Sequence, residues 1–405
     1  MVSDSIPTEL ILEILLRLPA KSITRFHCVS KQWASMLRCP SFTELFLTRS
    51  LVQPRLLFAL EQINMWSFFS LPQHHSRPYE KSSSPLEVAA NFHMKFPPGN
   101  MKIYPSRDRQ FSCGYASGLT YFYGMWIKPT DSYGVPVICN PITGRYAALP
   151  YLQRYRKAFS FFGFDPIDKQ FKVFFMAYPS GPDDHQILTL GTEEMKWKRI
   201  KCPIIHEIAS EGICINGVLY YVGDTSDFDL GDTSEKMPDL VIVCFDVRSE
   251  TFKFIYPEKF CQLIKYKGKL GVIYYDSYDD NAIELRLWVL EDVEKQEWSK
   301  YAYNLKGDNF TFHNVFVVGA TAIGEIVLSM GSFTSGRPFY VFYFNPERKT
   351  FRPFEIQGFG ERYNHSKVYV FVTMLMILML TIQIYSSQAS KLHSGRHRKK
   401  NQEQN

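Results

Sequence analysis

Few side chains in this sequence stand at spacings that chemistry requires. His74 and His75 are adjacent, so they would face different ways and lack the helical spacing of paired metal ligands. The acid-rich stretch 224–239 has some features of a calcium loop, but Leu and Gly follow Asp227 and Asp229, and the third ligand is missing. We interpret both segments as surface loops, and we predict neither a metal site nor a cofactor.

Catalytic motifs are missing as well. The sequence contains no G-x-S-x-G, H-E-x-x-H, Walker loop or G-x-G-x-x-G, and the string QGFGERY around Gly358 lacks the third glycine of a nucleotide-binding loop. The histidines are dispersed, and none lies at a productive offset from a Ser, a Cys or paired carboxylates. We predict that the chain is not an enzyme, although an active site assembled from distant residues stays open.

The cysteines and the N-terminus indicate a reducing compartment. The eight cysteines are scattered without a C-x-x-C pair, and most lie in apolar runs, where a free thiol behaves as a small buried hydrophobe. Residues 1–20 carry acids and an amphipathic pattern rather than the basic and apolar regions of a signal peptide. The expected location is the cytoplasm or the nucleus.

The charge distribution argues against a nucleic-acid partner. The formal net charge is +6, but five basic residues and one acid lie in the last fifteen positions, so the rest carries about +2. A nucleic-acid-binding domain needs a patch of clustered Lys and Arg on its body, and no such cluster occurs.

The first forty residues contain an apolar pattern with helical spacing. A helix is expected from Glu9 to Leu18, with Thr8 as N-cap and Pro19 as its stop, and shorter helices are expected over Ser22–Cys28 and Ser30–Leu37. In the first helix Leu10, Ile11, Ile14, Leu15 and Leu18 form one stripe, while Leu12 and Leu16 point elsewhere. Three short helices cannot cover this much apolar surface, so the excess predicts a docking surface.

These residues resemble an F-box of the large plant F-box families. The matching positions are Ile6, Pro7, Leu10, Ile11, Ile14, Leu15, Arg17, Leu18, Pro19, Lys21, Ser22, Arg25, Cys28, Val29, Ser30, Lys31, Trp33 and Phe42. The resemblance implies that the segment binds the Skp-type adaptor, and through it the cullin, of an SCF-type (cullin–RING) ubiquitin ligase. The adaptor contacts it implies are Ile6, Pro7, Leu10, Ile11, Leu15, Leu18, Pro19, Val29 and Trp33. The alternative is a three-helix cap in which Trp33 is only core.

The rest of the chain carries a loose repeat. The markers Asn140, Trp197, Asp246, Trp298 and Asn345 follow one another at steps of 57, 49, 52 and 47 residues, and strands keyed on Gly118, Gly163, Gly217, Gly268 and Gly324 run in step with them. A period near fifty with about four short strands per unit predicts a kelch-like β-propeller, with a twisted β-sandwich as the alternative. The order also resembles the plant F-box-associated domain over residues 54–372, which implies a propeller-like domain for protein recognition.

The run Val368 to Tyr385 is eighteen residues long and nearly uncharged, which is the lower limit for a membrane span. In one interpretation it anchors the chain in a membrane. In the other, Val368 to Val372 is the final strand of the β domain, and Met374 to Tyr385 is too short to span alone.

These observations predict a small all-α F-box followed by a large, mostly-β, propeller-like domain. The expected divisions are 1–48 for the F-box, 49–110 for a junction and first strands, 111–372 for the propeller-like domain and 373–405 for an apolar segment and basic tail. The resemblance implies a non-catalytic substrate receptor of a ubiquitin ligase whose target protein is unknown. Candidates for its binding are loops rich in aromatic and charged residues, Tyr151 to Arg156 and Asp224 to Asp239. The alternative function is a non-ligase propeller scaffold, with or without a membrane tether.

Overall fold

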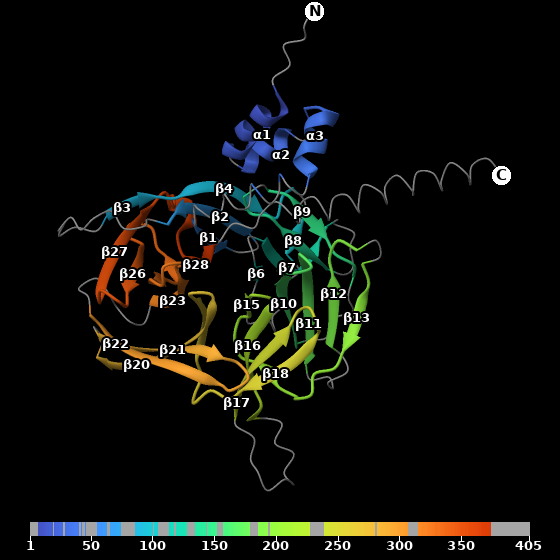
Figure 1. Ribbon diagram of the computed structural model, residues 1–405. Coiled ribbons are helices and arrows are strands. Elements are labelled where there is room, and N and C mark those ends of the chain that lie inside the picture. The colour runs from blue at the N-terminus through green and yellow to red at the C-terminus, as the bar shows by residue number, and fades with distance from the viewer. Residues whose placement is uncertain are drawn as a thin grey trace, which may run out of the picture.

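The computed structural model shows three helices followed by strands arranged as blades around a common axis (Figure 1). It describes the residues between 7 and 373, apart from 19, 27–28, 40–41, 43–44, 46–54, 63–64, 74–85, 100, 104–112, 117–118, 128–133, 143, 152–156, 179–184, 193–194, 227–238, 280–281 and 307–314.

The helices lie close to where the apolar pattern predicts them, but two caps differ. Their bounds are α1 Thr8–Arg17, α2 Ala20–Phe26 and α3 Lys31–Arg38. Pro7, not Thr8, holds the N-cap position of α1, and α2 begins before Ser22, so the capping roles expected for Thr8 and Ser22 are wrong. Ser30 caps α3, because its hydroxyl accepts a hydrogen bond from the Trp33 amide at 3.1 Å.

The described strands form six sheets, which confirms the propeller and excludes the sandwich. We call the first sheet the closing blade: β1 Arg55–Gln62, β2 Met65–Pro72, β4 Asn91–Phe96, β25 Ser332–Phe333 and β28 Ser366–Thr373. The second blade holds β5 Lys102–Ile103, β6 Cys113–Ala116, β7 Leu119–Trp126, β8 Val135–Cys139 and β9 Tyr146–Ala148. The third holds β10 Lys157–Asp165, β11 Gln170–Tyr178, β12 His185–Thr189 and β13 Trp197–Ile200.

The remaining three blades follow in chain order. The fourth holds β14 Glu207–Ile208, β15 Ile213–Ile215, β16 Val218–Asp224, β17 Leu240–Asp246 and β18 Thr251–Ile255. The fifth holds β19 Gln262–Tyr266, β20 Lys269–Asp279, β21 Ala282–Asp292 and β22 Glu297–Lys306. The sixth holds β23 Val315–Ala320, β24 Ile326–Met330, β26 Tyr340–Asn345, β27 Thr350–Gln357 and β3 Leu86–Ala89. Strands β1 to β5 all lie within 49–110, where a junction and first strands are expected, and all five pair in blade sheets.

The two ends of the propeller meet in the closing blade. Strand β28 pairs antiparallel with β1 along its length, from Arg55 opposite Thr373 to Glu61 opposite Lys367. Its side chains serve two cores, because Val368 and Val370 pack between the closing and sixth blades, while Tyr369 and Phe371 pack toward the second blade. The last strand of the propeller therefore completes the blade that the first strands begin.

This placement corrects the membrane interpretation of Val368 to Tyr385. A strand that is buried on both faces carries apolar side chains at consecutive positions, so Val368 to Val372 has the composition of a membrane span without its environment. Met374 to Tyr385 lies outside the described residues. Within the described part of the chain, no helix is long and apolar enough to cross a membrane.

The sequence repeat corresponds to turns and to the outer strands that follow them. Asn140, Asp246 and Asn345 begin the turns before β9, β18 and β27, while Trp197 and Trp298 lie at the start of β13 and β22. Five turns share one design, in which the first side chain accepts a hydrogen bond from the amide two residues later, at 2.8–3.1 Å, and the fifth residue has a positive φ. The turns are Asn140 to Gly144, Asp165 to Lys169, Asp246 to Glu250, Asp292 to Gln296 and Asn345 to Lys349.

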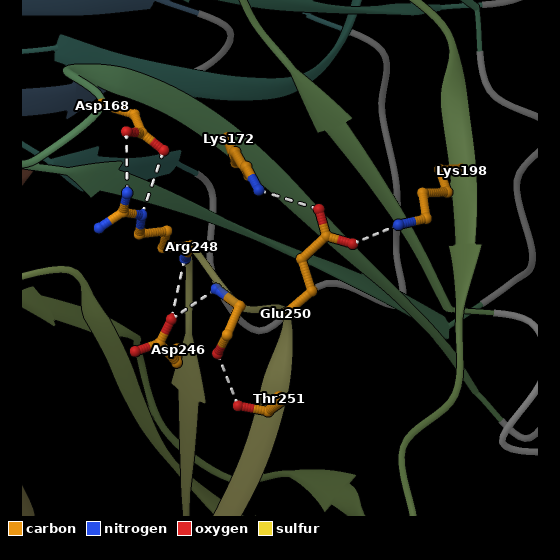
Figure 2. Close-up of polar contacts among 8 residues, drawn as sticks. Asp168, Lys172, Lys198, Asp246, Arg248, Glu250 and Thr251 are labelled. Atoms are coloured by element: carbon orange, nitrogen blue, oxygen red, sulfur yellow. Dashed lines mark hydrogen bonds and ion pairs between the residues drawn. The ribbon is translucent and has the colours of Figure 1, made fainter.

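One of these turns also joins two blades through an ion-pair network (Figure 2). The Glu250 carboxylate accepts from the Lys172 ammonium at 2.9 Å and from the Lys198 ammonium at 2.7 Å, and both lysines belong to the third blade. Burial would raise the pKa of Glu250, but the hydrogen bonds from Lys198 and Lys172 outweigh it and lower that pKa. Beside them Arg248 pairs with Asp168 at 3.3 Å. The turn thus holds the fourth blade against the third.

The substitution Glu250→Gln should destabilise the propeller, because the Lys172 side chain is only 9% exposed and loses its ionised partner. We expect a loss of about 1–3 kcal/mol in the free energy of unfolding at neutral pH, measured by urea denaturation. Since the pKa of Glu250 lies below its ordinary 4.5 in the folded state, the difference from the native chain should shrink as the pH falls through and below 4.5. Glu294→Gln, at the exposed pair with Lys253, is the matched control and should change stability little. Equal losses in both variants would contradict the assignment.

Candidate functional site

Helix α1 carries two of the exposed large apolar side chains of the helical module. Leu10 is 55% exposed and Ile14 is 53% exposed, and their spacing of four residues places them side by side on one helix face. We call this pair the apolar ridge. Val29, just before the Ser30 cap of α3, is 62% exposed. Large apolar side chains that a small module leaves in water at this level indicate a surface for a partner.

The opposite side of α1 fills the core of the module. The buried residues are Leu15, Leu16, Ile23, Leu37 and Phe42, with Ile11, Leu12, Leu18, Phe26 and Trp33 packed partly against them. The Trp33 ring lies 4.9 Å from the Phe26 ring between centroids. Leu12 and Leu16 therefore face inward, and the expectation that they point away from the packed stripe is wrong.

The structure separates the predicted contact residues by exposure. Pro7, Leu10 and Val29 are exposed, Ile11, Leu18 and Trp33 are partly buried, and Leu15 has no exposed area; Ile6 and Pro19 lie outside the described residues. Leu15 therefore offers a partner no surface in this conformation. Ile14 was missing from the predicted set, and its spacing from Leu10 was the signal that could have included it.

The buried thiols described in the propeller are held in their neutral form. Burial raises the pKa of Cys202 to about 11 and the pKa values of Cys244 and Cys261 to about 12, and it raises that of Cys139 further. None of these thiols is poised as a nucleophile. Among the described residues, no group of three His, Cys, Asp or Glu side chains could hold a metal ion.

One face of the propeller carries exposed aromatic side chains among its described residues. Because the strands of a blade alternate in direction, every connection from an outermost strand to the next inner strand lies on one face, which we call the loop face. These connections expose Tyr151, Ile205, Tyr256 and Phe260, and Phe316, the second residue of β23, is 53% exposed beside them. The opposite face carries the tight turns, the Lys172–Glu250 network and two exposed isoleucines, Ile167 and Ile323. Among the described residues, the loop face therefore carries exposed aromatic side chains that come from several blades.

Two loops that the sequence suggested for target binding are described only in part. Tyr151 is 49% exposed, but 152–156 lie outside the described residues. Of the stretch 224–239, positions 227–238 lie outside them as well. The exposed aromatic residues of the connection between β18 and β19, Tyr256 and Phe260, were not singled out from the sequence. Only the blade topology shows that they share a face with Tyr151.

Two known family models match the chain, one over the helical module and one over the propeller. The family model described as "F-box associated beta propeller domain" matches residues 55–375, and the F-box domain model matches residues 3–45. The chain belongs to the F-box proteins. Its propeller matches the F-box-associated model, so the kelch-like interpretation of the repeat is not supported.

Similar F-box proteins of Arabidopsis thaliana share most of this length. F-box protein At1g47340 is 66% identical over 92% of this chain and 80% of its own. Putative F-box protein At2g16220 is 56% identical over 92% of this chain and 90% of its own. F-box protein At2g15640 is 55% identical over 89% of this chain and 90% of its own. The order of F-box and propeller thus recurs within a family of plant F-box proteins.

The packing of the F-box predicts that two leucines of α1 differ in their contribution to the stability of the helices. Leu15→Ala should destabilise the F-box helices by about 2–5 kcal/mol, because it opens a cavity in a small core. Leu10→Ala removes an exposed side chain, so the helices should keep their stability within about 0.5 kcal/mol. Hydrogen exchange of α1 to α3 in the full chain, followed by mass spectrometry, measures both. Faster exchange in Leu10→Ala than in Leu15→Ala would contradict the assignment of the core.

Proposed function

We propose that the chain is the substrate receptor of an SCF-type cullin–RING ubiquitin ligase. In this proposal the F-box binds a Skp-type adaptor, which connects it to the cullin, and the propeller binds the protein to be ubiquitylated. The observation that carries the proposal is the apolar ridge of Leu10 and Ile14, which stays in water although the core beneath it is already filled. The cytoplasm or the nucleus is where such a complex would act.

The ridge supplies the driving force for adaptor binding. Burying a Leu or Ile side chain that is half exposed contributes on the order of 1 kcal/mol each, so a few such residues form an interface centre. We assign direct contacts to Pro7, Leu10, Ile14 and Val29, which are exposed. Ile11, Leu15, Leu18 and Trp33 act by holding the helices in place, and Ile6 and Pro19 remain predicted contacts.

The propeller contributes binding rather than chemistry. A ligase receptor needs no nucleophile of its own, since a partner enzyme transfers ubiquitin and the receptor keeps an acceptor lysine at high effective concentration. We assign target binding to the loop face, because aromatic side chains such as Tyr256, Phe260 and Phe316 lose little conformational entropy on binding and bury a large area.

Adaptor binding by the full chain tests the first half of the proposal. The double variant Leu10→Glu, Ile14→Glu places two charges in the proposed interface and should weaken binding of a plant Skp-type adaptor at least a hundredfold in calorimetry. The control Ile167→Glu, Ile323→Glu changes two isoleucines that are also exposed, on the propeller face opposite the loop face, and should bind like the native chain. Failure of the native chain to bind any such adaptor would overturn the ligase role and favour a non-ligase scaffold.

Target binding is tested separately by proximity crosslinking in plant extracts. Tyr256→Ser with Phe260→Ser should lose a set of crosslinked proteins that the native chain captures, while the adaptor is still captured. Ile167→Ser with Ile323→Ser, on the opposite face, should keep that set. The same proteins captured by both double variants would place the target site elsewhere.

A further inference from the structure

Among the described strands that form the outer edge of a blade, β22 is the longest. It has ten residues, whereas β4 has six, β9 three, β13 four and β18 five. It is the terminal strand of the fifth blade, and within the described part of the chain no strand pairs on its outer side. A long outermost strand presents a row of backbone N–H and C=O groups to water, which is a template for pairing with another strand.

In the neighbouring sixth blade, the corresponding strand edge is covered by another strand. Strand β27 has eight residues, and the chain covers it with β3, which pairs in parallel from Leu86 opposite Phe354 to Ala89 opposite Gln357. The outer edge of a blade therefore accepts one more strand. The edge of β22 is longer than that of β27 and has no such cover among the described residues.

The usual protections of an open edge are weak on β22. The strand contains no proline, and from Trp298 to Asn304 its one charged residue is Lys300. The Lys300 ammonium lies 3.5 Å from the centroid of the Trp288 ring on β21, so it is drawn toward the interior of the sheet instead of guarding the edge. The register irregularity of this hairpin falls at Leu290/Asp292 on β21, so it leaves the β22 edge regular.

Tyrosines dominate one face of β22. Tyr301 is 45% exposed and stacks on Tyr303 with ring centroids 6.4 Å apart. The Tyr303 ring meets the edge of the Phe344 ring at 5.1 Å, which fixes it against the sixth blade. The other face carries Lys300, Ala302 and Asn304, all exposed. A strand that pairs with β22 would meet an aromatic face that is already ordered.

We propose that β22 pairs antiparallel with β22 of a second copy of this chain, about a two-fold axis at Ala302. In an antiparallel pair, residues that lie opposite each other point to the same face of the sheet. Because the two-fold axis passes through residue 302, the numbers of two opposite residues add up to 604. Centring on Ala302 sets Tyr301 opposite the partner's Tyr303, and Lys300 opposite the partner's Asn304. The register therefore forms two aromatic cross-strand pairs, opposes no like charges and places the smallest side chain on the axis.

The assembly joins two propellers at their rims through a modest interface. An edge-to-edge strand pair buries less than the roughly 800 Å² per partner of a standard interface, so we expect a dissociation constant of about 1–100 μM. The fifth blade is separated from the closing blade, which the F-box precedes, by the sixth blade. The proposal goes beyond receptor function and holds whether or not the adaptor binds.

Disulfide trapping of the full chain tests the register directly. In Ala302→Cys the two new thiols face each other across the axis, with Cα atoms about 5 Å apart, which suits a disulfide. In Asn304→Cys, also at an exposed position, the same atoms are about 14 Å apart along the strands, which is too far. Under mild oxidation we expect a covalent dimer from Ala302→Cys alone, with the native chain and its own cysteines as reference. Equal crosslinking of the two variants, or none, would overturn the proposal.

A charge exchange tests association without crosslinking. By sedimentation equilibrium the native chain should show a dimer at tens of micromolar, while Ala302→Lys and Ala302→Glu should each be monomeric, because like charges meet on the axis. An equimolar mixture of the two variants should recover a dimer through the opposite charges. A native chain that stays monomeric at 200 μM, or a mixture that stays monomeric while the native chain dimerises, would refute pairing at Ala302.

Discussion

The ladder between β1 and β28 is the interaction on which the rest of this structure depends. Each blade is a sheet whose two faces are covered by neighbouring blades, so the closing blade and the blades next to it are covered on both faces only when the ring is complete. The ladder runs from Arg55 opposite Thr373 to Glu61 opposite Lys367, across the full length of the propeller sequence. Because β28 sends alternate side chains into two inter-blade cores, one strand both closes the ring and fills the gap on either side of it.

Local chemistry explains why the propeller could be predicted from its sequence. A turn that starts with Asn140 or Asp246 needs a short side chain able to accept from the amide two residues on, so the same residue types recur at blade spacing. The sequence could not distinguish β28 from a membrane segment, since Val368 to Val372 is apolar in both environments. Its surroundings include β1 and the second blade, which lie more than two hundred residues away and outside any window of sequence.

The F-box shows a different limit. The positions from Leu10 to Leu16 are apolar apart from Glu13, so the helical pattern alone does not say which side packs. The structure turns Leu15 and Leu16 inward and leaves Leu10 and Ile14 outside. Tertiary packing therefore decides which of these F-box residues are exposed. It also brings together the aromatic residues of the loop face, which lie far apart in sequence. The sequence shows which residue types both surfaces contain, but it does not show which of these residues are exposed or which face of the molecule they share.

Because β28 closes the ring, the propeller can complete its fold only at a late stage of synthesis on the ribosome. A ribosome releases the F-box first and the outer strands of the closing blade soon after, yet β28 emerges only after five other blades. The earliest blade to be made is thus the last to be complete, and a premature stop between the end of the F-box and Ser366 leaves an open ring behind an intact F-box. For such a chain, a single nonsense codon separates the F-box from the complete propeller.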